Sequence, residues 1–117
     1  RSMASLQFRK TWSVMGELLQ GDSGKTLWAM LDNIPGGFRF LDLGAAPGGF
    51  SGFLLSLTNC AWGVAVTLPP EVGFPVLVDQ AQEAAGRYAV HYADLMQLGP
   101  RYLASAALGG EAVQFCV

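Results

Sequence analysis

The sequence has little charge and few chemically reactive side chains. Its 117 residues include seven Lys or Arg, nine Asp or Glu, one His and two Cys, and the formal net charge is −2. A chain with this balance has no overall basic field that would attract nucleic acid. Its two cysteines, Cys60 and Cys116, lie far apart in the sequence. This sparse usage favours reduced, packed thiols and predicts an intracellular protein, cytoplasmic or nuclear.

Long hydrophobic runs and a signal-peptide pattern are also missing. No apolar stretch approaches the roughly 18 residues that a membrane span requires, so we expect no membrane contact. What is abundant is apolar side chains, at 51%, together with 15 glycines. This composition predicts one small folded domain over residues 1–117. The opening Arg-Ser-Met is interpreted as a cloning remnant and is left out of the fold prediction.

Helical and strand patterns alternate along most of the chain. N-terminal helices are expected within residues 5–33, with Ser5 as a possible cap and Gly21 as a stop. The expected helices are 5–20, 25–33, 49–58, 76–86 and 100–107, and the expected strands are 38–43, 62–67, 87–93 and 112–117. The proline-rich stretch 68–75 is expected to be irregular. Such alternation predicts an α/β fold with a mostly parallel sheet of about four strands.

Residues 21–26, GDSGKT, resemble part of a phosphate-binding loop. The full pattern needs a glycine five residues before Gly24, where Leu19 stands. A phosphate loop also follows a strand, whereas the segment before Gly21 has a helical pattern. We therefore interpret GDSGKT as a turn between helices.

A second glycine-rich stretch, GAAPGG at 44–49, has the strand before it and the helix after it that a ligand loop requires. A dinucleotide fingerprint would place its second glycine at Ala46. The acidic residue that would bind a ribose falls near Thr67. Both departures disfavour a nicotinamide or flavin cofactor.

Asp42, at the end of the strand before this loop, suggests a different ligand. A carboxylate there can hold an ammonium group, and glycines let the backbone pass close under a nucleoside. S-adenosylmethionine combines an amino-acid end with a nucleoside end and meets both demands. The alternative is a plain strand-to-helix turn in which Asp42 caps backbone amides.

The motif DLGAAPGGFS, residues 42–51, closely resembles the first motif of the FtsJ-like (RrmJ-type) RNA ribose 2′-O-methyltransferases. Trp12 and Glu17 resemble parts of that family's N-terminal helix, and residues 63–75 and 92–98 resemble its adenosine-binding loops. The resemblance implies a Rossmann-like methyltransferase fold with S-adenosyl-L-methionine as cofactor. It also implies a domain truncated relative to the seven-stranded family fold.

The resemblance also implies a set of cofactor-binding residues. Asp94 would lie at the adenine edge, although it is otherwise a carboxylate that ends a strand. We expect no metal site, and we expect His91 to be a strand residue, with a role as a base as the alternative. The implied cofactor-binding residues are Asp42, Gly44, Ala45, Ala46, Pro47, Gly48, Gly49, Phe50, Thr67, Leu68, Asp94 and Leu95.

Two departures from the family pattern affect catalysis. Aligning Trp12 and Glu17 places Val14 where the family has its first catalytic lysine, which leaves Lys10 as a weak candidate. The family's catalytic aspartate follows the fourth strand, and its second lysine and glutamate come later, beyond the end of this sequence. The catalytic residues are therefore unknown, and we expect the chain alone to be inactive.

Two functions of different classes remain. The first is an S-adenosylmethionine-dependent methyltransferase domain, with RNA 2′-O-ribose methyl transfer in the complete protein. The second is a catalytically inactive cofactor-binding or scaffold module that acts through an exposed sheet edge. Residues 112–117 are apolar and free of proline, so we expect a homodimer or association with a second chain through that edge.

Overall fold

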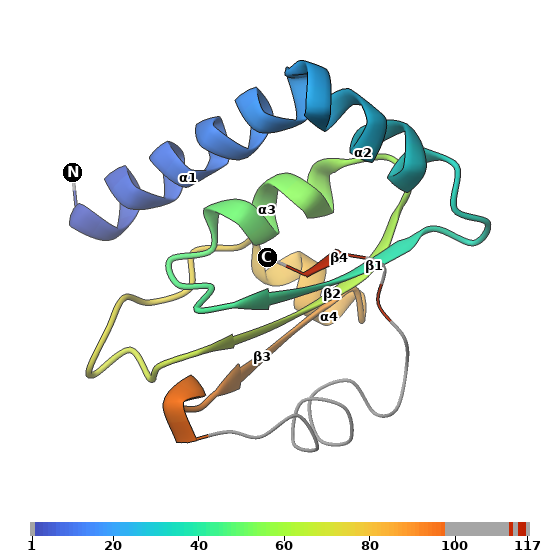
Figure 1. Ribbon diagram of the computed structural model, residues 1–117. Helices are drawn as coiled ribbons and strands as arrows, with labels where there is room; N and C mark the ends of the chain where they lie inside the picture. Colours follow the sequence, from blue (N-terminus) through green and yellow to red (C-terminus); the bar gives the residue numbers. More distant parts are fainter. Residues whose placement is uncertain (1, 98–112, 114, 117) are drawn as a thin grey trace.

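The computed structural model describes residues 2–97, 113 and 115–116 (Figure 1). The predicted helix at 100–107 lies outside these residues. The elements in chain order are α1 Met3–Gln20, α2 Asp22–Asp32, β1 Phe38–Leu43, α3 Gly49–Ser56, β2 Cys60–Thr67, α4 Gln80–Ala84, β3 Tyr88–Tyr92, a 3-10 helix Leu95–Gln97, and β4 Phe115–Cys116. The predicted α/β class is confirmed.

The four strands form one sheet in the order β3-β2-β1-β4, and every neighbouring pair is parallel. The central strand β1 pairs through Leu41 with Val64 on one side and Cys116 on the other. This is the order of the first four strands in doubly wound nucleotide-binding folds, so the architecture is compatible with a Rossmann-like fold. In such sheets ligands bind outside the carboxyl ends of the strands, near the position where the strand order reverses.

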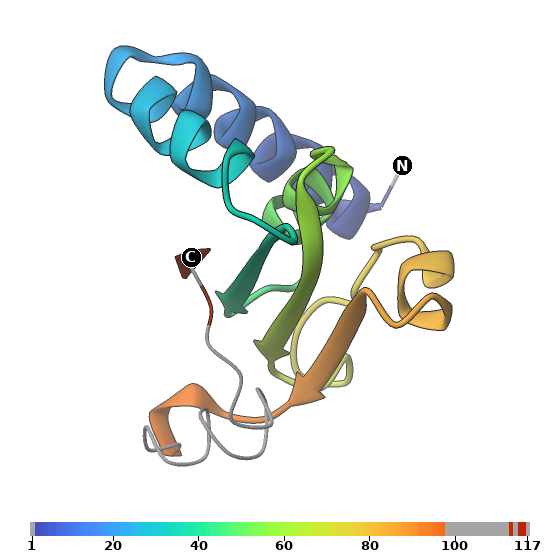
Figure 2. The ribbon, with the colours of Figure 1, turned by 90° about the vertical axis from the view of Figure 1, so that its right-hand side faces the viewer.

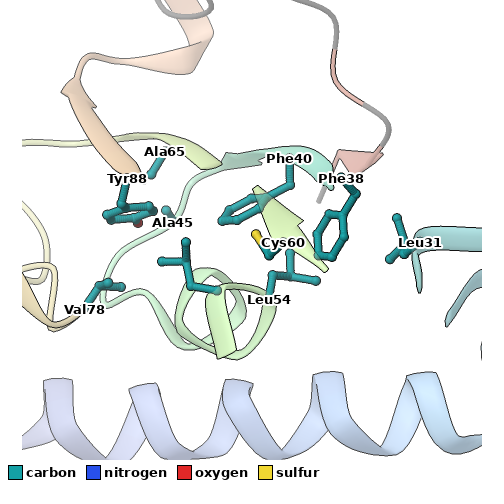
Figure 3. Close-up of a cluster of buried hydrophobic side chains, with 10 residues drawn as sticks. Leu31, Phe38, Phe40, Ala45, Leu54, Cys60, Ala65, Val78 and Tyr88 are labelled. Carbon is teal, nitrogen blue, oxygen red and sulfur yellow. The ribbon is translucent and has the colours of Figure 1, made fainter. Parts of the chain in front are cut away.

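One face of the sheet carries a layer of helices. α1, α2 and α3 lie on the same side of the sheet (Figures 1 and 2), and α3 packs between α1 and β2. The main core fills the space between these layers (Figure 3). Phe40 and Leu54 are fully buried there. A second, smaller cluster of buried residues consists of Leu41 on β1 and Val64 and Val66 on β2.

Gly63 on β2 makes room for the core aromatics. A Cβ atom at Gly63 would lie 2.0 Å from the Phe40 ring, so only glycine allows that ring to cross the neighbouring strand. The Phe40 ring also lies 6.5 Å, centroid to centroid, from the Tyr88 ring on β3. The aromatic side chains of β1 and β3 therefore meet over β2.

The beginning of α1 differs from the prediction. Ser2, not Ser5, is the N-cap, because its hydroxyl accepts a hydrogen bond of 3.0 Å from the Ser5 amide. Met3, which was left out as part of a cloning remnant, is the first helical residue. The predicted stop at Gly21 is confirmed, since Gly21 is the C-cap of α1.

The GDSGKT segment is mostly helical rather than a turn. Gly21 alone separates α1 from α2, and Asp22 begins α2. A Cβ atom at Gly24 would lie 1.7 Å from the Leu18 carbonyl oxygen, so this glycine permits the tight corner between the two helices. The absence of a preceding strand argues against a phosphate loop, as the sequence indicated.

The helix predicted at 76–86 is much shorter than expected. Only Gln80–Ala84 is helical, and Asp79 caps it by accepting a hydrogen bond of 2.9 Å from the Ala81 amide. Residues 76–78 run as an irregular segment beside the glycine loop, where the Leu77 amide donates to Pro47 O at 2.7 Å. Val78 is buried in the main core. A short apolar run does not by its pattern distinguish a buried irregular segment from a helix.

The Arg87 side chain connects α4, α3 and β2 by hydrogen bonds. Its guanidinium donates to Gln82 Oε1, to the Leu55 carbonyl at 3.2 Å and to the Cys60 carbonyl at 2.9 Å. Burial raises the pKa of the Cys60 thiol to about 11, and the nearby Arg87 charge opposes that rise. Cys60 and Cys116 are both free thiols.

None of the helices in the described part of the chain is long and apolar enough to cross a bilayer.

Candidate functional site

A pocket of about 310 Å³ opens at the carboxyl ends of β1, β2 and β3. The loops that follow these three strands form its walls. The arrowheads of the three strands point toward this end of the molecule in Figure 1. The lining residues are Gly44, Ala46, Thr67, Leu68, Gly73, Phe74, Ala93 and Asp94. This is the position at which open parallel sheets bind their ligands.

The first half of the glycine loop is held by β2. The Gly44 and Ala45 amides donate to Val66 O at 2.7 and 3.3 Å, and the Ala46 amide donates to Thr67 Oγ1 at 3.2 Å. Gly44 has a φ of 70°, a left-handed conformation that favours glycine. With these amides engaged, the loop presents a fixed surface of backbone and small side chains to the pocket.

The second half of the loop serves the packing of helices. Gly48 has a φ of 104°, and a Cβ atom there would lie 2.9 Å from Val78 Cγ2. A Cβ atom at Gly49 would lie 1.8 Å from Thr11 Oγ1 on α1. Gly48 and Gly49 are both buried and do not line the pocket. These two glycines therefore let α1 and the 76–78 segment approach the start of α3.

Asp42 lies beneath the loop rather than in the pocket wall. Its side chain is only 1% exposed, and Oδ2 accepts a hydrogen bond of 2.6 Å from the Ser51 hydroxyl on α3. Burial raises the pKa of Asp42 to about 6, and the Ser51 hydroxyl and backbone amide oppose that rise. Asp42 is thus mostly ionised at neutral pH and places a negative charge under the loop.

The described pocket lining is mostly small and apolar, and Asp94 is its one carboxylate. Asp94 lines its rim and is exposed, and Asp94 Oδ1 accepts a hydrogen bond of 2.9 Å from the Met96 amide. No lysine or arginine is found among the described lining residues. A neutral or cationic ligand suits such a pocket better than a pyrophosphate, which needs donors and positive charge.

The pocket brings together part of the predicted cofactor set. Gly44, Ala46, Thr67, Leu68 and Asp94 line it. Leu95 begins the 3-10 helix directly after Asp94. The remaining predicted residues belong to the loop or flank it but do not line the pocket: Asp42, Ala45, Pro47, Gly48, Gly49 and Phe50.

Three lining residues were not predicted individually: Gly73, Phe74 and Ala93. The sequence signal for Gly73 and Phe74 is the irregular stretch 68–75, which resembles a family loop and in which only Leu68 is an implied cofactor-binding residue. Phe74 is 37% exposed, so part of its ring is accessible from the pocket that it lines.

The proposed catalytic position lies apart from this pocket. Lys10 and Val14 are on the exposed surface of α1, and neither lines the pocket. Val14 instead borders a shallow groove at the α1–α2 corner, beside Glu17 and Leu18. His91 is a half-buried residue of β3 whose register partner is Val66.

Within the described ranges, no three His, Cys, Asp or Glu side chains gather as a metal site would require. Comparisons with protein-family models, with curated proteins and with solved structures found no match to this chain.

Proposed function

We propose that this chain is an S-adenosylmethionine-binding domain of the FtsJ-like methyltransferase type, and that the complete protein methylates ribose 2′-hydroxyls of RNA. The observation that carries the proposal is the pocket at the carboxyl ends of three parallel strands, next to the loop after β1 and with Asp94 in its lining. The ligand carries an ammonium and a sulfonium charge, which two nearby carboxylates would favour.

The residues present fit this ligand. Gly44 and Ala46 offer a surface without bulky side chains, along which a nucleoside can lie. Asp94 can accept a hydrogen bond from an exocyclic amine, and Phe74 offers a ring face for a purine. When bound, S-adenosylmethionine would supply a methyl group activated by its positive sulfur. The chain's own residues would hold and orient it.

Methyl transfer also needs a group that activates the acceptor hydroxyl. Lys10 lies outside the pocket, and no described lining residue is a general base other than Asp94. We therefore propose cofactor binding by this chain without appreciable transfer of its own. RNA as the acceptor rests on the family resemblance.

Phe74 provides a test of this proposal. Replacing Phe74 by Ala should weaken the binding of S-adenosylhomocysteine about tenfold, because a purine loses its stacking surface. Isothermal titration calorimetry measures the affinity. The matched control is Val72→Ala, a change in the same loop at a side chain that is 69% exposed and does not line the pocket. Equal affinities of the Phe74→Ala and Val72→Ala variants would show that Phe74 does not contact the ligand.

A second candidate function, a module that associates through its sheet edge, is favoured by the position of β4. This strand is last in the sheet order, and Cys116 on it is exposed. An unpaired edge offers backbone groups to another strand. We propose a homodimer, or a complex with a second chain, formed through this edge.

The edge proposal predicts a dimer in sedimentation velocity at micromolar concentration. Cys116→Lys should convert the dimer to a monomer, because a lysine on an edge strand opposes strand addition. Met96→Lys, at a side chain that is 92% exposed and off the sheet, should leave the dimer intact. A monomeric parent chain at every concentration contradicts the edge proposal.

A further inference from the structure

Three polar side chains from three different elements meet in the core beneath the glycine loop. They are Asp42 on β1, Ser51 on α3 and Tyr88 on β3, with exposed fractions of 1%, 0% and 4%. Ser51 donates its hydroxyl proton to Asp42 Oδ2 at 2.6 Å. Tyr88 packs among the apolar residues of the main core, in the cluster that also contains Ala45 of the loop (Figure 3).

The Tyr88 hydroxyl is an anomaly in this cluster. It is buried, and it has no hydrogen-bond partner among the residues that the structure describes. Burial raises the pKa of Tyr88, and the Ser51 hydroxyl opposes that rise. A buried hydroxyl without a partner is unfavourable, and native structures retain few of them.

The chemistry of the three groups suggests how the hydroxyl is used. A serine hydroxyl donates one hydrogen bond and can accept two more. Because the Ser51 proton points to Asp42, its oxygen is free to accept from a phenol. A short movement of Tyr88 would complete a chain of two hydrogen bonds, from Tyr88 to Ser51 and from Ser51 to Asp42. In such chains each bond strengthens the next.

We propose that Ser51 and Tyr88 are positioning residues for Asp42. Their hydroxyls form a hydrogen-bonded relay beneath the glycine loop, and this relay stabilises the Asp42 carboxylate. Binding of a cationic ligand in the adjoining pocket then depends on pH. The identity of that ligand as S-adenosylmethionine rests on the proposed function. The relay itself is a property of the ligand-free chain.

Among the described residues, the other titratable groups that interact electrostatically with the cluster are Glu83 on α4 and Tyr92 on β3, which act on Tyr88, and Cys116 on β4, which interacts with Asp42. α3 carries no titratable residue, and β2 carries only Cys60, which contacts Arg87. A change in the titration of Asp42 can therefore be traced to a small set of neighbours.

The test is a carbon-detected NMR titration of the Asp42 carboxyl group in the ligand-free chain. Tyr88→Phe removes only the hydroxyl and should raise the Asp42 midpoint by about 0.3 to 1 pH unit, and Ser51→Ala should raise it by about 1 unit or more. Ser56→Ala on the same helix should leave the midpoint unchanged. Ser56 is exposed, so it does not belong to the buried cluster.

A double variant separates the relay from a general effect of burial. In the Ser51→Ala background the change Tyr88→Phe should have no further effect on the midpoint, because the link is already broken. An equal effect of Tyr88→Phe in both backgrounds, or no effect in either, would overturn the relay.

The link to ligand binding is measured separately, with S-adenosylmethionine as the probe. Its affinity should fall about threefold between pH 7.5 and pH 5.5 in the parent chain, as Asp42 becomes protonated. In Tyr88→Phe the fall should begin at higher pH. Complete absence of binding would refute the proposed function and the ligand link but leave the NMR result to decide the relay. Binding that does not vary with pH would overturn the ligand link alone.

Discussion

Gly49→Ala should destabilise the domain by about 3 kcal/mol or more, even though alanine is the better helix former. The added Cβ would lie 1.8 Å from Thr11 Oγ1 and 2.3 Å from the Phe8 carbonyl oxygen. The Phe8 oxygen belongs to the backbone of α1 and cannot rotate away. α1 would have to separate from α3, and this contact carries the helical layer of the fold. Urea denaturation followed by circular dichroism measures the free energy of unfolding.

Two further variants make this prediction specific. Gly21→Ala is the control, because its Cβ would lie 3.6 Å from the Leu18 carbonyl oxygen, an ordinary van der Waals contact, and Gly21 has a φ of −72°. Its stability should change by less than about 0.5 kcal/mol. The double variant Thr11→Ala, Gly49→Ala should recover only part of the loss, because the Phe8 oxygen remains. Full recovery would show that only the threonine side chain limits the approach of the helices.

Asp42→Asn should abolish a component of the pH dependence of stability. The pKa of Asp42 is raised from its ordinary 3.8 to about 6 in the folded chain, chiefly by burial. Between these values the folded state binds the proton more tightly than the unfolded state does. Stability from this group is therefore greatest below about pH 4 and falls as the pH rises to about 6. From below about pH 4 to neutral pH, the contribution of Asp42 to the free energy of unfolding falls by about 3 kcal/mol. Asparagine does not titrate, so the variant should lack this change.

The measurement is the unfolding free energy of both proteins between pH 4 and pH 8. The difference between parent and Asp42→Asn isolates this group from the other titrating residues. The same variant should bind S-adenosylmethionine about tenfold more weakly at pH 7.5, because the charge beneath the loop is gone. Parallel stability curves for the two proteins would show that Asp42 has an ordinary pKa.

The elements with strong local patterns were predictable from the sequence. β1 has the predicted bounds of 38–43, because its residues form an apolar run closed by a glycine turn. The strand-loop-helix context of residues 38–56 and the parallel sheet follow from the same alternation of patterns. Residues 76–79 were mispredicted because their backbone conformation depends on Pro47 and on the core, which are distant in sequence.

The site was predictable in outline but not in the roles of its residues. A glycine in a sequence motif does not reveal whether it makes room for a ligand or for a neighbouring helix. The structure separates Gly44, at the pocket, from Gly49, against α1. Similarly, the sequence does not reveal that Asp42 lies beneath the loop and accepts a buried hydrogen bond from Ser51. These distinctions depend on tertiary contacts that local patterns do not encode.

The most direct test of the central proposal is a titration of the ¹⁵N-labelled chain with S-adenosylhomocysteine, followed by amide chemical shifts. We expect saturable binding, with the largest shifts at residues 44–46, 67–68, 73–74 and 93–94, which surround the pocket. Saturable binding at these residues would support the cofactor site. No saturation at millimolar ligand, or shifts centred on the separate pocket beside Trp28, Leu31 and Asn59, would contradict it.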